Sequence, residues 1–184
     1  MKFNQGEIMF IIISGASGVG KNTVIEELMK RNKNLEYLTS CSTREPRVGQ
    51  IGKGYIFLSR DEMDRKIKNN ELFEHEEVHG YIYGTLNSNV QEVIDGKKDF
   101  IKDLGVIGQK YFTTKLKDKV LIKSFYLTCP KDVLEQRLIA RGEKEVEKRL
   151  ARFDFEESHK GNFDYVIENI NLDETVDFIQ SKLH

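Results

Sequence analysis

The hydrophobic and polar positions alternate between strand-like and helix-like segments along most of the chain. Ile8 to Ser14 is an almost uninterrupted apolar run that ends at Gly15, which is typical of a parallel strand buried on both faces. Val24 to Arg31 then carries apolar residues at helical spacing. The chain is therefore predicted to begin with a strand, a glycine-rich loop and a helix.

The same alternation returns in the second half of the chain. The pattern predicts these elements: a helix over Leu86–Asp95, strands over Phe100–Leu104 and Leu121–Leu127, helices over Lys131–Arg141 and Val146–His159, a strand over Tyr165–Glu168 and a helix over Leu172–Leu183. Parallel strands with helical crossovers predict an α/β fold with a doubly wound sheet. In such folds, ligands bind at the carboxyl ends of the strands.

The segment Leu35–Thr85 has a different pattern. Short alternating pieces near Tyr55 and Tyr83 flank one amphipathic helix at Asp61–Asn69. We therefore expect one domain over residues 1–184, with a core formed by 1–38 and 86–184 and a small mixed α/β subdomain inserted at about 39–85.

Composition limits the class of protein and its partners. At 184 residues, 39% hydrophobic and 32% charged, the chain is an ordinary globular one, and 29 basic against 30 acidic residues give a net charge of −1. Neither nucleic acid nor a membrane is an expected partner, because no overall basic field is present and the early apolar run is far shorter than the roughly 20 residues of a span. Two distant cysteines without a CxxC motif suit a reducing compartment, so we expect a cytoplasmic protein.

The loop after the first strand fits the phosphate-binding pattern GxxxxGK. It consists of Gly15, Ala16, Ser17, Gly18, Val19, Gly20, Lys21, Asn22 and Thr23. Glycines let backbone amides converge on phosphate oxygens, and the lysine adds a positive charge. Asn22 stands where a Ser or Thr hydroxyl usually contacts magnesium, and Thr23 could replace it. A plain glycine turn between a strand and a helix is the alternative.

A second group of residues could hold another anion. Arg44 and Arg47 lie three apart beside Pro46 and could form a fork for a terminal phosphate, although a solvated surface loop fits the same pattern. Farther on, the Glu74 carboxylate could accept from two adjacent donors, as the N1 and N2 edge of guanine offers. Hydroxyls of Ser40 and Thr85 could donate to O6. Tyr83-Gly84-Thr85 could also be no more than a hairpin turn.

Taken together, these motifs resemble the guanylate kinase family. The resemblance rests on GASGVGKNT, STREPRVG, GYIFLSRDEM, ELFEHEEVHGYIYGT and VIEN, which occur in the family's order over nearly the whole chain. It implies a P-loop kinase fold with a short helical lid at about 141–150. It also implies transfer of the γ-phosphate of Mg-ATP to GMP, giving ADP and GDP, by a monomer or homodimer.

The resemblance also assigns site residues. The implied GMP-binding residues are Ser40, Arg44, Arg47, Tyr55, Glu74, Tyr83 and Thr85. Arg137 and Asn169 join the phosphate loop on the ATP side, and Asn169 is placed near adenine. Lys21, Arg44, Arg141 and Arg149 are the expected catalytic residues. Asn22 and Asp103 are expected to hold Mg²⁺, Asp103 through water.

The chain departs from the family pattern around the strand that ends at Asp103. Gly105 stands where the family has a second Asp that helps to grip guanine, and Ile107 replaces a Gln. A hydrogen bond to a charged group contributes about 1.5–3 kcal/mol, so weaker base discrimination is expected. A P-loop kinase for another small phosphorylated acceptor is therefore the main alternative. A guanylate kinase-like protein-binding module is a further one, although such modules lack a working phosphate loop and lid arginines.

Overall fold

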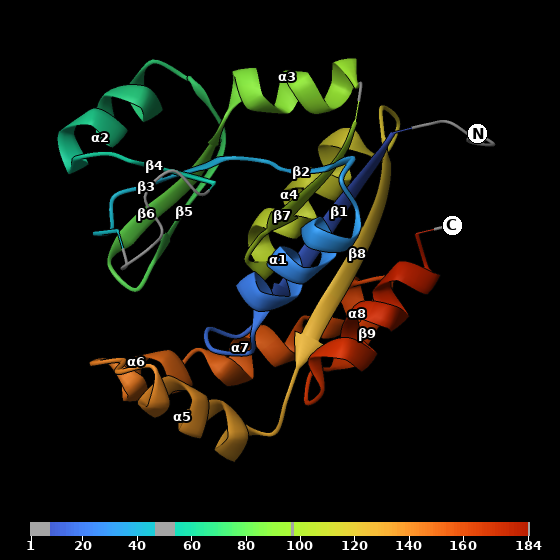
Figure 1. The fold of residues 1–184 in the computed structure, drawn as a ribbon. Helices are drawn as coiled ribbons and strands as arrows, with labels where there is room; N and C mark the ends of the chain where they lie inside the picture. The colour runs from blue at the N-terminus through green and yellow to red at the C-terminus, as the bar shows by residue number, and fades with distance from the viewer. Residues whose placement is uncertain (1–7, 47–53, 97, 184) are drawn as a thin grey trace.

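A central parallel sheet forms the body of the molecule (Figure 1). The computed structural model describes residues 8–46, 54–96 and 98–183. The sheet has five strands in the order β2-β7-β1-β8-β9, and every pairing in it is parallel. Its strands are β1 (Met9–Gly15), β2 (Leu35–Tyr37), β7 (Asp99–Asp103), β8 (Leu121–Thr128) and β9 (Tyr165–Glu168).

The central strand β1 is buried along its whole length, and its two faces support two separate cores. Ile11 and Ile13 pack into a cluster with side chains of α1 (Lys21–Arg31), α5 (Lys131–Ala140) and α8 (Leu172–Ser181). Phe10 and Ile12 pack into another cluster with α3 (Asn87–Asp95) and α4 (Val106–Leu116). Helices therefore cover both faces, and the predicted α/β fold with a doubly wound sheet is confirmed.

A second, mixed sheet lies beside the central one (Figure 1). Its strands, in the order β4-β3-β6-β5, are β3 (Ser40–Ser42), β4 (Tyr55–Phe57), β5 (Leu72–Val78) and β6 (Tyr81–Leu86). The helix α2 (Arg60–Lys68) begins with a capping box between Ser59 and Glu62, and its Met63 packs on this sheet. The β5–β6 turn has His79 at φ 55° and Gly80 at φ 84°, as a type I′ hairpin turn requires.

The segment predicted as one helix over Val146–His159 is divided in the structure. It forms α6 (Val146–Leu150) and α7 (Phe153–Ser158), followed by the short 3₁₀ helix η1 (Lys160–Asn162). The break lets Phe153 pack against the core cluster while Arg152 reaches an acidic residue of β5. A continuous helix would have fixed the relative directions of these two side chains.

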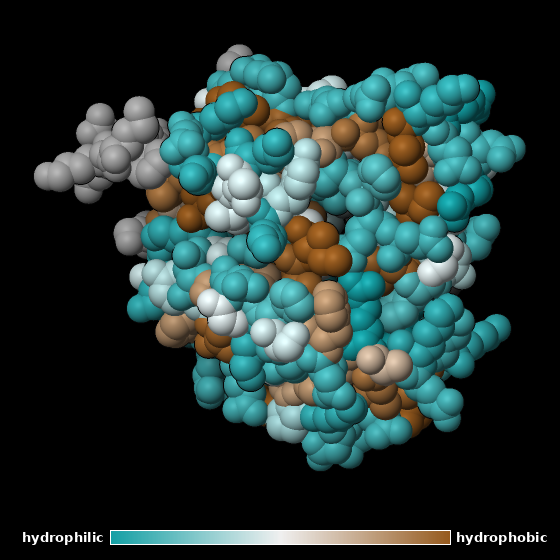
Figure 2. Space-filling model, turned by 180° about the vertical axis from the view of Figure 1, so that it is seen from behind, coloured by the Kyte–Doolittle hydropathy of each residue, from teal (hydrophilic) through white to brown (hydrophobic). Residues whose placement is uncertain are grey.

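Figure 2 shows that hydrophilic side chains cover most of the reverse face and that hydrophobic ones form short groups among them. The helices that the structure describes include none with the length and apolar character needed to cross a membrane.

Candidate active site

One cavity of about 500 Å³ lies between the carboxyl ends of β1 and β7, the second sheet and the segment around α6 and α7. All predicted site residues that the structure describes line it, except Ala16, Val19 and Thr85, which are buried behind it. Arg47 lies outside the described residues. The fold therefore brings together segments more than a hundred residues apart in the sequence.

The phosphate-binding loop has a backbone that only glycine accommodates at two key positions. Gly15 has φ 135°, and a Cβ there would lie 2.2 Å from the Leu127 carbonyl oxygen. Gly20, the residue before α1, has φ 106°, and a Cβ there would lie 2.6 Å from Asn169 Nδ2. These glycines place the N-terminus of α1, with its unpaired amides, at the cavity.

Lys21 folds back over this loop. Its ammonium donates to the carbonyl oxygens of Gly15 at 2.6 Å and Ala16 at 3.2 Å. Burial lowers the pKa of Lys21, and the nearby carboxylates of Glu156 and Asp103 partly oppose that shift. The positive charge is thus held at the centre of the loop.

Two side chains from late in the sequence brace the loop. Asn169 Nδ2 donates to the Val19 carbonyl oxygen at 2.7 Å, and its Oδ1 accepts from Thr175 Oγ1 at 2.8 Å. Arg137 donates to the same Val19 oxygen at 3.1 Å and to the Asn169 carbonyl oxygen at 2.9 Å. In this structure Arg137 and Asn169 hold the loop against the C-terminal part of the chain.

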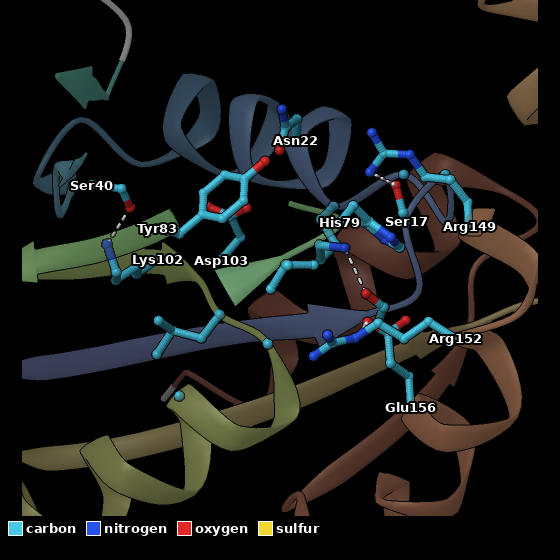
Figure 3. A pocket seen from close by; sticks show the side chains of 18 of the residues that line it. Ser17, Asn22, Ser40, His79, Tyr83, Lys102, Asp103, Arg149, Arg152 and Glu156 are labelled. Carbon is cyan, nitrogen blue, oxygen red and sulfur yellow. Dashed lines mark hydrogen bonds and ion pairs between the residues drawn. The ribbon is translucent and has the colours of Figure 1, made fainter. Parts of the chain in front are cut away.

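Arg141 and Arg149 converge on the same loop. Their guanidinium groups donate to Ser17 Oγ at 3.4 Å and 3.1 Å, and Figure 3 shows the bond from Arg149. Glu143 lies between them, 2.9 Å from Arg141 and 3.1 Å from Arg149. Burial raises the pKa of Glu143, but the Arg141 hydrogen bond and the Arg149 charge outweigh it and lower the pKa below its usual value. The negative charge of Glu143 reduces the repulsion between the Arg141 and Arg149 guanidinium groups, which lie close together.

On the opposite side of the cavity, a buried lysine meets the side chains predicted to contact a base. Lys102 donates to Ser40 Oγ (Figure 3) and to the Leu38 carbonyl oxygen at 3.2 Å. Glu74 accepts from Thr85 Oγ1 at 2.6 Å. Burial raises the pKa of Glu74, and the Lys102 charge opposes the shift. Sequence analysis missed Lys102, because one lysine in an apolar strand does not show which way it points.

Aromatic rings surround Arg44 at the other end of this pocket. Its guanidinium lies 5.0 Å from the centre of the Tyr55 ring and 5.2 Å from that of Phe57, within cation–π range. The Tyr55 hydroxyl, 3.2 Å away, and the Tyr37 hydroxyl both donate to the Asp103 carboxylate. Burial and the Asp103 charge raise the pKa of both tyrosines. The contacts with the Tyr55 and Phe57 rings hold the Arg44 guanidinium in place.

The donor set at the loop suits a magnesium ion that arrives with a nucleotide. The described residues contain no group of three or more His, Cys, Asp or Glu side chains that could hold a metal. Asn22 and Thr23 are exposed at the start of α1, and the Asp103 carboxylate already accepts from tyrosines. Mg²⁺ commonly keeps waters and phosphate oxygens as ligands, and these residues fit that mode.

The structure also shows cavity residues that sequence analysis did not select. Glu76 forms an ion pair with Arg152, whose Nε lies 3.3 Å from Glu156 Oε1 (Figure 3). Burial raises the pKa of Glu156, and the Lys21 charge opposes the shift. The signal for Glu76 was present, because it stands two residues after Glu74 on a strand and must share its face. Arg152 and Glu156 carried no comparable signal.

A phosphate loop at the end of the central strand, facing a second sheet whose strands and loops carry Arg44 and the Glu74 carboxylate, defines a P-loop kinase of the nucleotide-binding class. The family model for guanylate kinase matches residues 8–184. The chain belongs to the guanylate kinase family.

Individual relatives agree over most of the chain. It is 37% identical to a guanylate kinase of Clostridium tetani over 177 residues, covering 94% of this chain and 84% of that protein. It is 38% identical to one of Prochlorococcus marinus, covering 90% and 91%. The crystal structure of guanylate kinase from Anaplasma phagocytophilum aligns with a TM-score of 0.74 at 28% identity, covering 96% and 84%. A shikimate kinase from Bacteroides thetaiotaomicron, 15% identical with a TM-score of 0.53 and coverage of 95% and 98%, shares the fold.

Proposed function

We propose that this guanylate kinase transfers the γ-phosphate of Mg-ATP to GMP and releases ADP and GDP. The observation that carries the proposal is a single cavity with Lys21 and the phosphate loop on one side and Arg44 and Glu74 on the other. This arrangement suits two phosphorylated ligands that meet end to end.

On the donor side, the amides of the phosphate loop and the Lys21 ammonium hold the β- and γ-phosphates. Arg137 and Asn169 keep the loop in shape through Val19, and Asn169 lies at the adenine side. Asn22 and, through water, Asp103 would hold the Mg²⁺ that accompanies ATP. Bound there, the ion would neutralise charge on the phosphate oxygens.

On the acceptor side, we assign the GMP pocket to the insert at about 39–85. Arg44 and Arg47 bind its phosphate, with Tyr55 and Tyr83 beside them. Ser40 donates to guanine O6, and the Lys102 hydrogen bond to Ser40 Oγ leaves its hydroxyl hydrogen for that bond. Glu74 accepts from N1 and N2. Thr85 acts through Glu74, to which its hydroxyl already donates.

We assign the lid to residues of about 141–150. On closure, Arg141 and Arg149 leave Ser17 for the transferred phosphoryl group, whose oxygens offer full negative charge in place of a neutral hydroxyl. No general base is required, since the phosphate oxygen of GMP is already ionised at neutral pH. Catalysis then consists of alignment and charge neutralisation. The enzyme acts in the cytoplasm, in purine nucleotide metabolism, as a monomer or homodimer.

The test is ADP formation with a panel of nucleoside monophosphates in the presence of ATP and Mg²⁺. GMP is expected to support a kcat/KM at least about a hundredfold above those for AMP, CMP and UMP, because only guanine combines an O6 acceptor with adjacent N1 and N2 donors. A better rate with another acceptor would favour the alternative P-loop kinase. Tight GMP binding without ADP formation would favour a protein-binding module, although the described cavity keeps Lys21, Arg141 and Arg149.

A further inference from the structure

Gly105 leaves a space that a carboxylate from another element fills. A Cβ built at Gly105 would lie 2.9 Å from Glu76 Oε2, and apart from the adjacent residues of the chain, Glu76 supplies the nearest atoms to it among the described residues. Gly105 immediately precedes α4, and both it and Glu76 line the cavity. Gly105 has no acidic side chain, and the carboxylate of Glu76 from β5 therefore fills the space beside it.

The alternation of β5 explains how Glu76 reaches this place. Along the strand, Glu74, Glu76 and Val78 face the cavity, while His75 and Glu77 are exposed. Glu74 Oε2 lies 3.7 Å from a Cβ built at Gly108, one helical turn beyond Gly105. Two carboxylates from one strand thus lie over two glycines of the same helix end, on one wall of the acceptor pocket.

The two oxygens of Glu76 have different surroundings. Oε1 accepts from Arg152, which also lies beside Glu156. Oε2 is the atom that faces Gly105, and no hydrogen bond from any described residue reaches it. Arg152 therefore fixes the side chain through one oxygen and leaves the other directed toward the pocket.

We propose that Glu76 is a specificity-determining residue for the acceptor: its Oε2 accepts a hydrogen bond from the 2-amino group of guanine. The inference rests on the proposed function. Guanine offers three N–H hydrogens along its N1 and N2 edge, and one carboxylate in the plane of the base can take two of them. Glu74 takes N1–H and one hydrogen of the amino group, and Glu76 takes the other. The loss of an acid at position 105 then costs no base discrimination.

The test compares GMP with IMP, which lacks only the 2-amino group, as acceptors for each variant. Glu76→Ala is expected to lower the ratio of kcat/KM for GMP to that for IMP by about tenfold to a hundredfold, as expected for one hydrogen bond to a charged group. Glu76→Gln keeps an acceptor oxygen without the charge, so its ratio should fall between those of Glu76→Ala and the wild type. The KM for ATP should stay unchanged in both.

Relocation of the carboxylate separates a direct contact from a structural effect. Glu76→Ala combined with Gly105→Asp should regain at least part of the GMP preference that Glu76→Ala loses. Gly105→Asp alone should lower GMP turnover, because its side chain would meet Glu76 Oε2. Glu77→Ala is the matched control, since Glu77 is the next residue of the strand and its side chain is 55% exposed. It should keep the wild-type ratio, and thermal unfolding of every variant reports whether it is folded.

The outcomes distinguish the two proposals. A wild-type chain that phosphorylates no nucleoside monophosphate overturns the proposed function and this inference with it. A wild-type chain that phosphorylates GMP, together with folded Glu76→Ala and Glu76→Gln variants that keep its GMP-to-IMP ratio, overturns the assignment of Glu76 alone. A folded double variant with the same ratio as Glu76→Ala overturns the placement beside Gly105.

Discussion

Lys21 carries a charge that no ion pair compensates in the described part of the chain. Its ammonium bonds two carbonyl oxygens of its own loop, and the carboxylates that influence it lie farther away. Carbonyl groups are neutral, so a phosphate oxygen at the same place would bind the ammonium more strongly. Arg141 and Arg149 differ, because Glu143 lies beside both of them.

Lys21→Ala should therefore reduce turnover by about a hundredfold to a thousandfold, since it removes a charge from the transferred phosphate, where a single donor can contribute 10²–10³ in rate. The affinity for GMP should change less than about twofold, because Lys21 belongs to the donor side. A coupled assay of ADP formation measures the first quantity, and isothermal titration with GMP alone measures the second. A near wild-type rate would contradict the assignment of the donor site.

Among the elements, the β5–β6 hairpin combines a strained turn with a group of cations. His79 lies at its tip, and its carbonyl oxygen accepts from Lys148 at 3.2 Å. Burial lowers the pKa of His79 to about 4, and the charges of Arg149, Arg152 and Lys148 add to the shift. Between pH 6.5 and about pH 4, His79 is therefore mostly neutral in the folded chain but protonated in the unfolded chain.

The sign of the pH effect follows from this difference. Unfolded histidine binds its proton near pH 6.5, so the contribution of His79 to stability is fully present above that pH and is lost as the pH falls toward 4. His79→Asn, which tolerates the positive φ, should lose less stability than the wild type between pH 7 and pH 5. Urea unfolding at both pH values measures the difference. His75→Asn on the exposed face of β5 is the control, and an identical pH dependence in His79→Asn and the wild type would contradict the expectation.

Most elements of the central sheet could be predicted from the sequence, because buried strands and amphipathic helices leave clear patterns. The helix α4 could not be predicted. Its buried residues include Gly108 and Gln109 as well as Val106 and Phe112, and this mixture gives no apolar stripe in the sequence. The break between α6 and α7 accompanies the contact of Arg152 with Glu76, which no local pattern encodes. For the site, the motifs identified most lining residues, whereas Lys102 and Arg152 required the tertiary structure.

At the scale of the whole molecule, the groups that we assign to the donor and to the acceptor belong to different sheets that share one cavity. The phosphate loop follows β1 of the central sheet, while Ser40, Arg44 and Glu74 belong to the second sheet or its loops. Contacts from Lys148 to His79 and from Arg152 to Glu76 join the segment around α6 and α7 to the β5–β6 hairpin. Each ligand can thus bind without the other, and both should stabilise the same folded state.

GMP and a non-hydrolysable ATP analogue, each at a hundred times its Kd, should each raise the free energy of unfolding by about 2.7 kcal/mol. For a chain of this size, that corresponds to an increase in Tm of about 5–11 °C for each ligand. The two increments should add when both ligands are present, because their contacts are separate. Thermal unfolding with each ligand and with both measures this. If the second ligand added nothing, the two would share one site.

The bracing of Val19 by Arg137 of α5 and by Asn169, the residue after β9, links the N-terminal loop to the last third of the chain. Synthesis proceeds from the N-terminus, and a domain generally folds as a unit. A nascent chain that has exposed the whole glycine motif still lacks the amide and guanidinium that hold it. The braced form of the glycine motif consequently arises only late in translation, once the C-terminal part of the chain has been made.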